Sequence, residues 1–311
     1  MDSQSILKHF IDIDQLNKED IKFLIDSSIL IKKQDKNSNN GLSGKNIAVI
    51  FEKNSTRTRV SFEVAINQLG GDSIIMSSSN MQISKGETIS DTAQVLSRYV
   101  DAIVIRANCH QTILDLAKYS TIPVVNALSD FSHPCQILAA IMTFIENFGD
   151  INGKKLVWLG EQNNVLNSYI HIAKFFNFEL VISSPPNMNF SYYQIIKAQK
   201  LGAKISVESN PNIAVINADV LISDTWFSMG DKMQDDDNLR QQKINQLMPY
   251  QVNEKLMKLA KKDAIFSHCL PAYRGFEVTK DVIDSKQSIV FDEAENRLHS
   301  QKAILLWLFA K

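Results

Sequence analysis

The sequence has few cysteines, no export signal and no long hydrophobic run. Its 311 residues include three cysteines, none of them in a CxxC pair, and the opening MDSQSILKHF does not form a secretory signal. These features favour a reducing compartment, the cytosol, over a disulfide framework. The longest late apolar run, Ala303 to Ala310, is far shorter than the roughly 20 residues of a membrane-spanning helix. We therefore expect no membrane segment.

The sequence also lacks an excess of positive or negative charge, and it lacks two nucleotide-binding motifs. Lys and Arg number 33 against 34 Asp and Glu, so the net charge is -1 and favours neither nucleic acid nor an anionic membrane as partner. No GxxxxGK[ST] occurs, which excludes a P-loop. The segment that begins at Gly160 lacks GxGxxG, which disfavours a nicotinamide cofactor. Small molecules are the expected ligands.

What the sequence does have is an alternation of short β-branched runs and helix-period segments, the pattern of βαβ units on a parallel sheet. An opening helix and a polar loop over 34–45 precede it. Strands are expected over 47–51, 72–76, 101–106, 123–128, 155–160, 178–183, 203–207, 218–224 and 264–271. Helices are expected over 18–33, 61–69, 89–99, 111–119, 135–148, 164–176 and 192–201.

The alternation stops at 150–153 and then resumes, which indicates two domains. The chain is also longer than the ~250 residues at which single cores stop growing. We predict an α/β protein with two doubly wound parallel sheets, in domains 1–148 and 149–293, and with the active site in the cleft between them. A last helix, 294–311, follows the strand-like run 288–292, and we expect it to pack back on the first domain.

The polar residues just past each strand are the candidate binding residues, because ligands bind at the carboxyl ends of parallel strands. After the run 47–51 come Ser55, Thr56, Arg57, Thr58 and Arg59. Hydroxyls, backbone N–H groups and guanidinium groups at a helix start suit a phosphate dianion. The alternative is an ordinary N-capped helix with solvated arginines. Spacing alone does not decide between them.

Two further strand ends fit the same anion. Arg106 closes an apolar run and is either a solvated strand edge or a second contact to the anion. His133 stands before Pro134, near the N-cap of a helix, where the dipole disfavours imidazolium and a neutral ring can donate to a developing oxyanion. The alternative for His133 is a structural hydrogen bond.

The second series of strands ends in different chemistry. Asp224 and the Ser228 hydroxyl are suited to an ammonium group, or else form a turn. Cys269 could serve as nucleophile, ligand or small buried hydrophobe. His268 beside Cys269 is a weak metal signal, because adjacent strand residues point to opposite faces.

Six motifs, taken in order, resemble the carbamoyltransferases over nearly the whole chain, and among them the members that use ornithine. They are FEKNSTRTRVSFEVA, KGETISDTAQVLSRYVDAIVIR, NALSDFSHPCQ, DTWFSMG, HCLPAYRG and FDEAENRLHSQKA. The resemblance implies transfer of the carbamoyl group of carbamoyl phosphate to the δ-amine of L-ornithine. It implies no metal and no organic cofactor, because the substrate is already activated, and it implies a homotrimer.

The resemblance also implies roles for individual residues. Arg57, Arg106, His133 and Cys269 match the catalytic set, with Cys269 or the leaving phosphate as proton acceptor. The carbamoyl-phosphate set is Ser55, Thr56, Arg57, Thr58, Gln82, Arg106, His133, Pro134, Cys135, Gln136, Cys269, Leu270 and Arg297. The ornithine set is Asn164, Asp224, Ser228 and Met229. In this family the loop that holds Gln82 typically reaches a neighbouring subunit's site.

The sequence departs from the family pattern at four positions: Asn54 replaces a proline, Glu161-Gln162 an Asp-Gly-like pair, and Tyr273 a histidine. Aspartate, putrescine or an acylated ornithine are the alternative acceptors, and a non-catalytic binding protein is the alternative from another class. Asp224 favours free ornithine, since a carboxylate suits an ammonium group and repels the second acid of aspartate. Both directions of the reaction would use the same residues.

Overall fold

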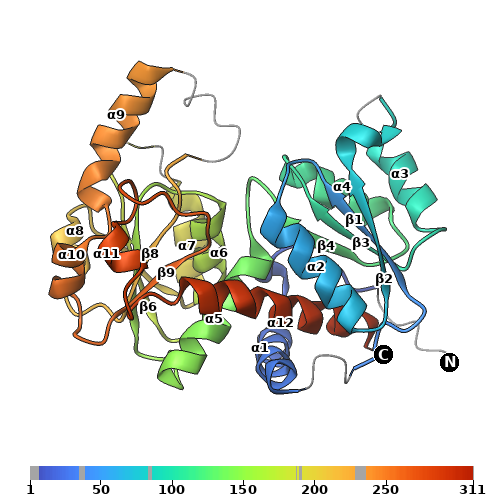
Figure 1. The fold of residues 1–311 in the computed structure, drawn as a ribbon, viewed down its shortest axis with the longest axis horizontal. Coiled ribbons are helices and arrows are strands. Elements are labelled where there is room, and N and C mark those ends of the chain that lie inside the picture. Colours follow the sequence, from blue (N-terminus) through green and yellow to red (C-terminus); the bar gives the residue numbers. More distant parts are fainter. Residues whose placement is uncertain are drawn as a thin grey trace. The chain divides into compact units, whose positions relative to one another are not determined.

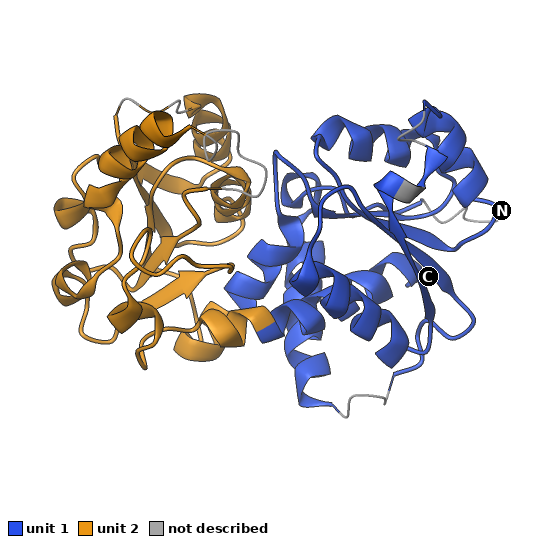
Figure 2. Ribbon diagram, turned by 45° about the horizontal axis from the view of Figure 1, so that its top comes forward, with its two compact units in different colours: residues 1–142, 295–311 blue, residues 143–294 orange. Residues whose placement is uncertain are grey.

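The computed structural model describes residues 7–34, 39–82, 86–186, 188, 191–227 and 236–310 (Figure 1). The chain forms two compact units: unit 1 comprises residues 1–142 and 295–311, and unit 2 comprises residues 143–294 (Figure 2). The chain passes from one unit to the other within two helices, α5 (Pro134–Phe148) and α12 (Val290–Phe309).

Unit 1 contains a four-stranded parallel sheet in the order β2-β1-β3-β4. Its strands are β1 (Asn46–Phe51), β2 (Asp72–Ser77), β3 (Ala102–Arg106) and β4 (Val124–Leu128). Its helices, besides parts of α5 and α12, are η1 (Ile13–Gln15), α1 (Lys18–Lys33), α2 (Thr56–Gln68), η2 (Ser78–Asn80), α3 (Ile89–Leu96) and α4 (His110–Tyr119). β1, β3 and β4 are almost wholly buried, as β-branched runs of a parallel sheet covered on both faces should be.

The part of α12 in unit 1 packs beside α1. Lys32 Nζ donates to Asn296 Oδ1 at 2.8 Å, and Trp307 Nε1 donates to Asp20 Oδ1 at 2.9 Å. The last helix thus lies against elements near the start of the chain, and this packing brings Arg297 to the site described below.

Unit 2 contains a five-stranded parallel sheet in the order β7-β6-β5-β8-β9. Its strands are β5 (Lys155–Leu159), β6 (Glu179–Ser183), β7 (Lys204–Val207), β8 (Val220–Ser223) and β9 (Ile265–His268). Its helices are α6 (Asn164–Ala173), α7 (Tyr192–Lys200), α8 (Pro211–Ala214), α9 (Asp237–Leu247), η5 (Met248–Tyr250), α10 (Glu254–Leu259) and α11 (Lys280–Ile283). The strand order reverses at β5, and such a switch point is where open α/β sheets bind ligands.

The predicted fold class is confirmed, because both sheets are parallel and doubly wound. The strand-like reading of 288–292 is wrong. Ser288 forms one isolated bridge with Phe266, and α12 begins at Val290. A short apolar run is ambiguous between strand and helix when periodicity is the only guide. Here Ile289 and Val290 are apolar because they are buried at the start of a helix.

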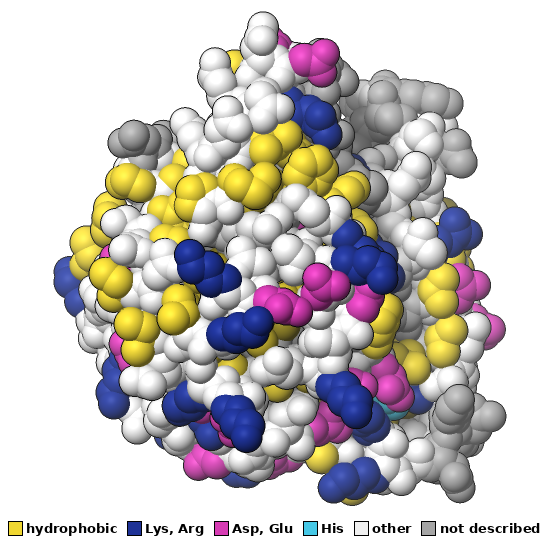
Figure 3. Space-filling view, turned by 60° about the vertical axis from the view of Figure 1, so that its left-hand side comes forward, with side chains coloured by type: hydrophobic (Ala, Val, Ile, Leu, Met, Phe, Trp, Pro, Cys, Tyr) yellow, Lys and Arg dark blue, Asp and Glu magenta, His cyan; other side chains and the backbone are white. Residues whose placement is uncertain are grey.

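No helix in the described ranges has both the length and the apolar character needed to cross a bilayer. Basic and acidic side chains lie interspersed on the face shown in Figure 3, with apolar side chains among them. Described residues of that face therefore present charges of both signs, the distribution expected from a net charge of -1.

Candidate active site

The first part of the site lies where β1 leads into α2. Ser55 is the N-cap of α2, and its Oγ accepts from the Thr58 N–H at 3.3 Å and from Arg106 Nη1 at 3.1 Å. Thr58 Oγ1 accepts from Arg297 Nη2 at 2.8 Å. Because both hydroxyl oxygens accept from N–H donors, each hydroxyl can direct its own hydrogen at a ligand. The junction therefore offers O–H donors, backbone N–H groups and two guanidinium groups to one anion.

His133 lies at the start of α5, as its place before Pro134 predicted. Its carbonyl accepts from the N–H groups of Gln136 and Ile137, the first bonds of the helix. Burial, and then the positive charges of Arg297 and Arg106, hold the pKa of His133 well below its ordinary value of 6.5. The ring is therefore neutral at neutral pH and suited to donate a hydrogen bond to a developing oxyanion.

Cys135 follows in the first turn of α5 and is fully buried. Its Sγ donates to the Asn126 carbonyl at 3.4 Å, and burial raises the pKa of the thiol to about 12. Asn126 in turn donates through Nδ2 to the Ile11 carbonyl and to Ser132 Oγ. Cys135 and Asn126 thus pack together beneath the turn that carries His133, and sequence reasoning missed Asn126.

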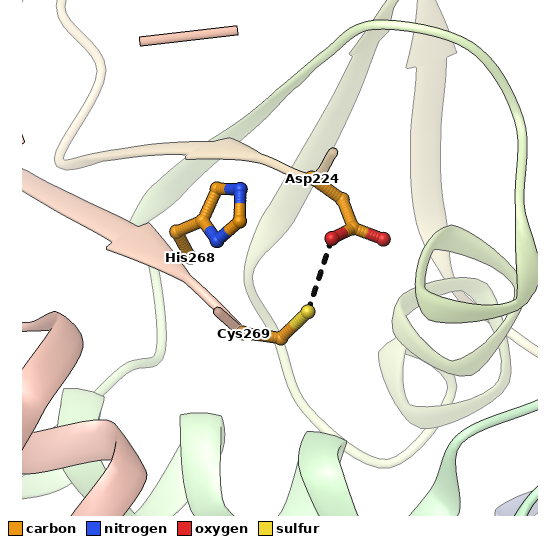
Figure 4. Close-up of side chains that lie close together, drawn as sticks. All are labelled: Asp224, His268 and Cys269. Carbon is orange, nitrogen blue, oxygen red and sulfur yellow. Dashed lines mark hydrogen bonds between the residues drawn. The ribbon is translucent and has the colours of Figure 1, made fainter. Parts of the chain in front are cut away.

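A separate group of predicted site residues lies in unit 2, around the carboxylate of Asp224, just past the end of β8. Its Oδ2 accepts from Asn163 Nδ2 at 2.7 Å, and its Oδ1 accepts from Cys269 Sγ at 3.0 Å (Figure 4). Asn163 also caps α6, since its Oδ1 accepts from the Val165 and Leu166 N–H groups. Asp224 is thereby fixed between an amide and a thiol. Sequence reasoning missed Asn163, although an asparagine before an apolar helical run is a typical N-cap.

His268 joins Asp224 and Cys269 in a compact group whose donor atoms lie within 4.8 Å of one another (Figure 4). The side chains of His268 and Cys269 were expected on opposite faces of a strand. Cys269 lies past the last residue of β9, so this alternation does not separate the two side chains. Thiolate, imidazole and carboxylate are the donors that zinc prefers. Here His268 Nδ1 accepts from the Leu270 N–H at 2.8 Å, so the lone pair of this nitrogen is used in a hydrogen bond within the protein.

A buried polar network lies behind Cys269. Ser267 Oγ donates to Glu293 Oε2 at 2.6 Å. Burial, and then the charge of Glu293, raise the pKa of Tyr169 well above its ordinary value, although a hydrogen bond with Ser267 opposes the rise. Tyr169 therefore keeps its proton. Glu293 lies in the motif FDEAENRLHSQKA, but no role was predicted for it, because its bond to Ser267 depends on α12 packing against β9.

Several predicted residues are placed apart from these contacts. The side chains of Thr56, Arg57 and Gln82 are exposed, and Arg57 makes no hydrogen bond or ion pair with the described part of the chain. Asn164 begins α6, and its carbonyl accepts from Ser168 Oγ. The predicted ornithine residues Ser228 and Met229 lie outside the described residues.

The departure at Glu161-Gln162 has a structural account. Glu161 Oε1 pairs with Lys243 Nζ of α9 at 2.6 Å. Gln162 donates to Asn167 Oδ1 and accepts from the Ser191 N–H. Both side chains connect the turn after β5 to neighbouring elements. The side chain of this turn that donates to Asp224 is that of Asn163.

The basic and hydroxylic side chains of unit 1 suit an anionic ligand, and the carboxylate–thiol pair of unit 2 suits an amine, a combination expected of a group-transfer enzyme. The chain belongs to the aspartate/ornithine carbamoyltransferase family. The model of its carbamoyl-P binding domain matches residues 8–146, and the model of its Asp/Orn binding domain matches residues 152–308.

Individual relatives agree with this assignment. The chain is 50% identical over 309 residues to the ornithine carbamoyltransferase of Rhodopseudomonas palustris (strain BisA53), covering 97% of each chain. The structure of ornithine carbamoyltransferase from Pyrococcus furiosus is similar with a TM-score of 0.90 and 43% identity, covering 96% of each chain. An acetylornithine transcarbamylase complexed with acetylcitrulline is similar with a TM-score of 0.85 and 30% identity, covering 98% of this chain and 100% of that one.

Proposed function

We propose that the protein is an ornithine carbamoyltransferase, which forms L-citrulline and phosphate from carbamoyl phosphate and L-ornithine. The observation that carries the choice of ornithine is the Asp224 carboxylate, held between Asn163 Nδ2 and Cys269 Sγ. A carboxylate in this setting suits an amino acid that brings an α-ammonium group and a second amine. The relative that is 50% identical supports the same acceptor.

Unit 1 would bind the phosphate. The hydroxyl of Ser55, whose oxygen accepts from Arg106, donates to a phosphate oxygen at the start of α2. The helix dipole and the guanidinium groups stabilise the dianion while it leaves. Arg57 is exposed beside them and adds its charge on ligand binding.

The same unit would stabilise the reacting carbonyl. Attack on the carbonyl carbon gives a tetrahedral oxyanion, which Arg106, His133 and Thr58 would stabilise; one donor in such a role is typically worth about 3–4 kcal/mol. The C–O bond to phosphate then breaks, and citrulline and phosphate form. The lowered pKa of His133 supports its role, because a neutral ring is available at neutral pH.

Unit 2 would bind the amine. Asp224 pairs with the α-ammonium group, and Asn164 donates to the α-carboxylate. The δ-nitrogen loses a proton as it attacks, and either Cys269 or the leaving phosphate accepts it. Because Cys269 Sγ donates to Asp224, the thiol accepts a proton only after it passes its own to that carboxylate.

The alternative acceptors fit the proposed ornithine residues less well. Aspartate would bring a second carboxylate to Asp224, and like charges repel. An acylated ornithine has a neutral amide in place of the α-ammonium group and would leave the Asp224 carboxylate without its cationic partner, which is costly in a partly buried site. Putrescine keeps an ammonium group for Asp224 but lacks the α-carboxylate to which Asn164 would donate.

An amine panel tests the proposal. The purified protein is supplied with carbamoyl phosphate and with ornithine, N-acetylornithine, aspartate or putrescine in turn, and the carbamoylated product is measured. We expect product from ornithine. Product only from another amine would contradict the acceptor, and carbamoyl-phosphate binding without product from any amine would favour the non-catalytic binding protein.

We also propose a cytosolic homotrimer in which Gln82 serves a neighbouring subunit's site, as the family resemblance implies. Light scattering after size-exclusion chromatography measures the assembly. Co-expression of Gln82→Ala and Cys269→Ala chains tests the sharing, because mixed trimers would contain some sites with both residues intact. Activity above that of either variant alone is expected, and its absence in verified mixed trimers would contradict the shared site.

A further inference from the structure

The turn that presents Cys269 rests on a carboxylate for which the reaction above has no role. Glu277 and His268 have fully buried side chains, and Glu277 Oε1 lies 3.4 Å from His268 Nε2. The same Oε1 accepts from the Tyr273 N–H at 2.6 Å. Buried ionisable pairs are often no more stable than apolar side chains of similar size. The presence of a carboxylate at this buried position therefore points to a role other than packing.

The carboxylate contacts both ends of the segment 269–273. At the far end it holds the Tyr273 N–H. At the near end it faces His268, whose Nδ1 accepts from the Leu270 N–H at 2.8 Å. Because Nδ1 accepts, the hydrogen of a neutral ring is on Nε2, the atom that faces Glu277. The contact lacks hydrogen-bond geometry, so Glu277 acts on the ring that holds Leu270 through the electrostatic attraction between its carboxylate and the Nε2 side of the ring.

Leu270 needs this support. Its φ of 57° lies in the left-handed region, where residues other than glycine are strained. The preceding residue, Cys269, directs Sγ at Asp224 Oδ1 at 3.0 Å. If Leu270 relaxed to an extended conformation, the backbone beside Cys269 would rotate and the thiol would move away from Asp224.

Glu277 is itself well anchored. Its carbonyl accepts from the Val252 N–H at 2.9 Å, and Val252 and Val278 are fully buried. The carboxylate is therefore a fixed point, and the segment 269–273 is held against it.

We propose that Glu277 is a positioning residue for the carbamoyl transfer. Through His268 and the Tyr273 N–H it holds the strained turn that places Cys269 against Asp224. It touches no reacting atom. The proposal rests on the proposed function for its kinetic part, but the geometry of Cys269 can be measured without substrate.

The test compares Glu277→Leu with Glu277→Gln. Leucine removes the acceptor, whereas glutamine keeps an Oε1 for the Tyr273 N–H. In Glu277→Leu we expect kcat to fall roughly 10²-fold, the size of effect that a displaced catalytic group produces. The affinity for inorganic phosphate, measured by calorimetry, should stay within about twofold, because the proposed contacts to the phosphate group, Ser55, Arg57 and Thr58, lie in unit 1. Glu277→Gln should recover most of kcat.

Alkylation without substrate gives the independent readout. Iodoacetamide modification of Cys269 is followed by peptide mass spectrometry, with exposed Cys109 in unit 1 as internal reference. In Glu277→Leu the ratio of Cys269 to Cys109 modification rates should rise at least about fivefold, as local loosening exposes the thiol. Asp284→Asn is the matched control, because Asp284 holds Arg274 of the neighbouring turn from the exposed side.

An unchanged alkylation ratio in folded Glu277→Leu would overturn the proposal, and so would equal loss of kcat in the glutamine and leucine variants. If Glu277→Leu does not fold, the glutamine variant decides: a kcat and an alkylation ratio near those of the wild type support the proposal, and loss of both overturns it. If the amine panel showed another acceptor, the alkylation ratio would still decide the role of Glu277.

Discussion

The two compact units have the same layout, a parallel sheet with polar side chains past its strand ends, but they carry opposite chemistry at those ends. Unit 1 presents Arg106, Arg297 and a neutral His133 beside hydroxyls. Unit 2 presents Asp224 with an amide and a thiol. One set suits a phosphate dianion and the other a cationic amine. If the proposed function holds, each unit selects its ligand by the sign of its charge, so variants in one unit should affect mainly one substrate.

The largest effect is expected from Arg57→Ala in unit 1. The side chain is exposed, so its loss should leave the melting temperature unchanged. Turnover should fall roughly 10³-fold, because a charged donor to the leaving phosphate is lost. Citrulline formation and thermal melting measure the two quantities. Near-normal turnover would remove Arg57 from the mechanism.

Asp224→Asn in unit 2 should weaken the binding of ornithine and leave the binding of carbamoyl phosphate unchanged. A hydrogen bond to a charged group is worth about 1.5–3 kcal/mol, so the KM for ornithine should rise about 10- to 100-fold. Carbamoyl-phosphate affinity, measured by calorimetry, should stay the same because its proposed phosphate residues lie in unit 1. A comparable loss of carbamoyl-phosphate affinity would contradict the assignment of one substrate to each unit.

A smaller effect concerns pH and His133. Its pKa is lowered in the folded protein, so below 6.5 the unfolded chain binds a proton that the folded protein does not. The free energy of unfolding should therefore fall as the pH is lowered from 7 towards 5, by at most about 1.4 kcal/mol per pH unit for this residue. Urea unfolding of wild type and His133→Gln measures the difference between the two slopes. Identical slopes would mean that His133 is accessible to protons in the folded state.

The smallest effect is expected from Tyr273→His, which restores the residue usual in the family. The Tyr273 side chain is 44% exposed, and the group that serves the turn is its backbone N–H. Stability should change by less than about 0.5 kcal/mol, as for most surface substitutions. The kcat should likewise stay close to that of the wild type. A large loss of activity would show that the ring itself contributes.

Local patterns in the sequence were enough to predict the strands and much of the site. The β-branched runs marked the strands because most of those strands, β2 and β7 excepted, are buried in parallel sheets. Ser55 was recognisable as a cap because capping is local. His133 followed from its place before Pro134. Each of these signals depends only on residues within a few positions of one another.

Contacts between distant segments could not be predicted in this way. The bond from Arg297 to Thr58 joins residues 239 positions apart, so only the family resemblance suggested Arg297. Asn163 and Asn164 are equally good amides in sequence, and only the pairing of β5 with β8 brings Asn163, which follows β5, to Asp224. The run 288–292 was misread because burial at a helix start and burial in a strand need the same apolar residues.

The bond between Thr58 and Arg297 also bears on how the protein is made. Thr58 is translated early, but its partner lies on α12, the last helix of the chain. A nascent chain can form the sheet of unit 1 long before this bond, since domains fold progressively during synthesis. The bond can form only after α12 has left the ribosome and docked on unit 1, so binding at the proposed anion site would depend on synthesis through this helix.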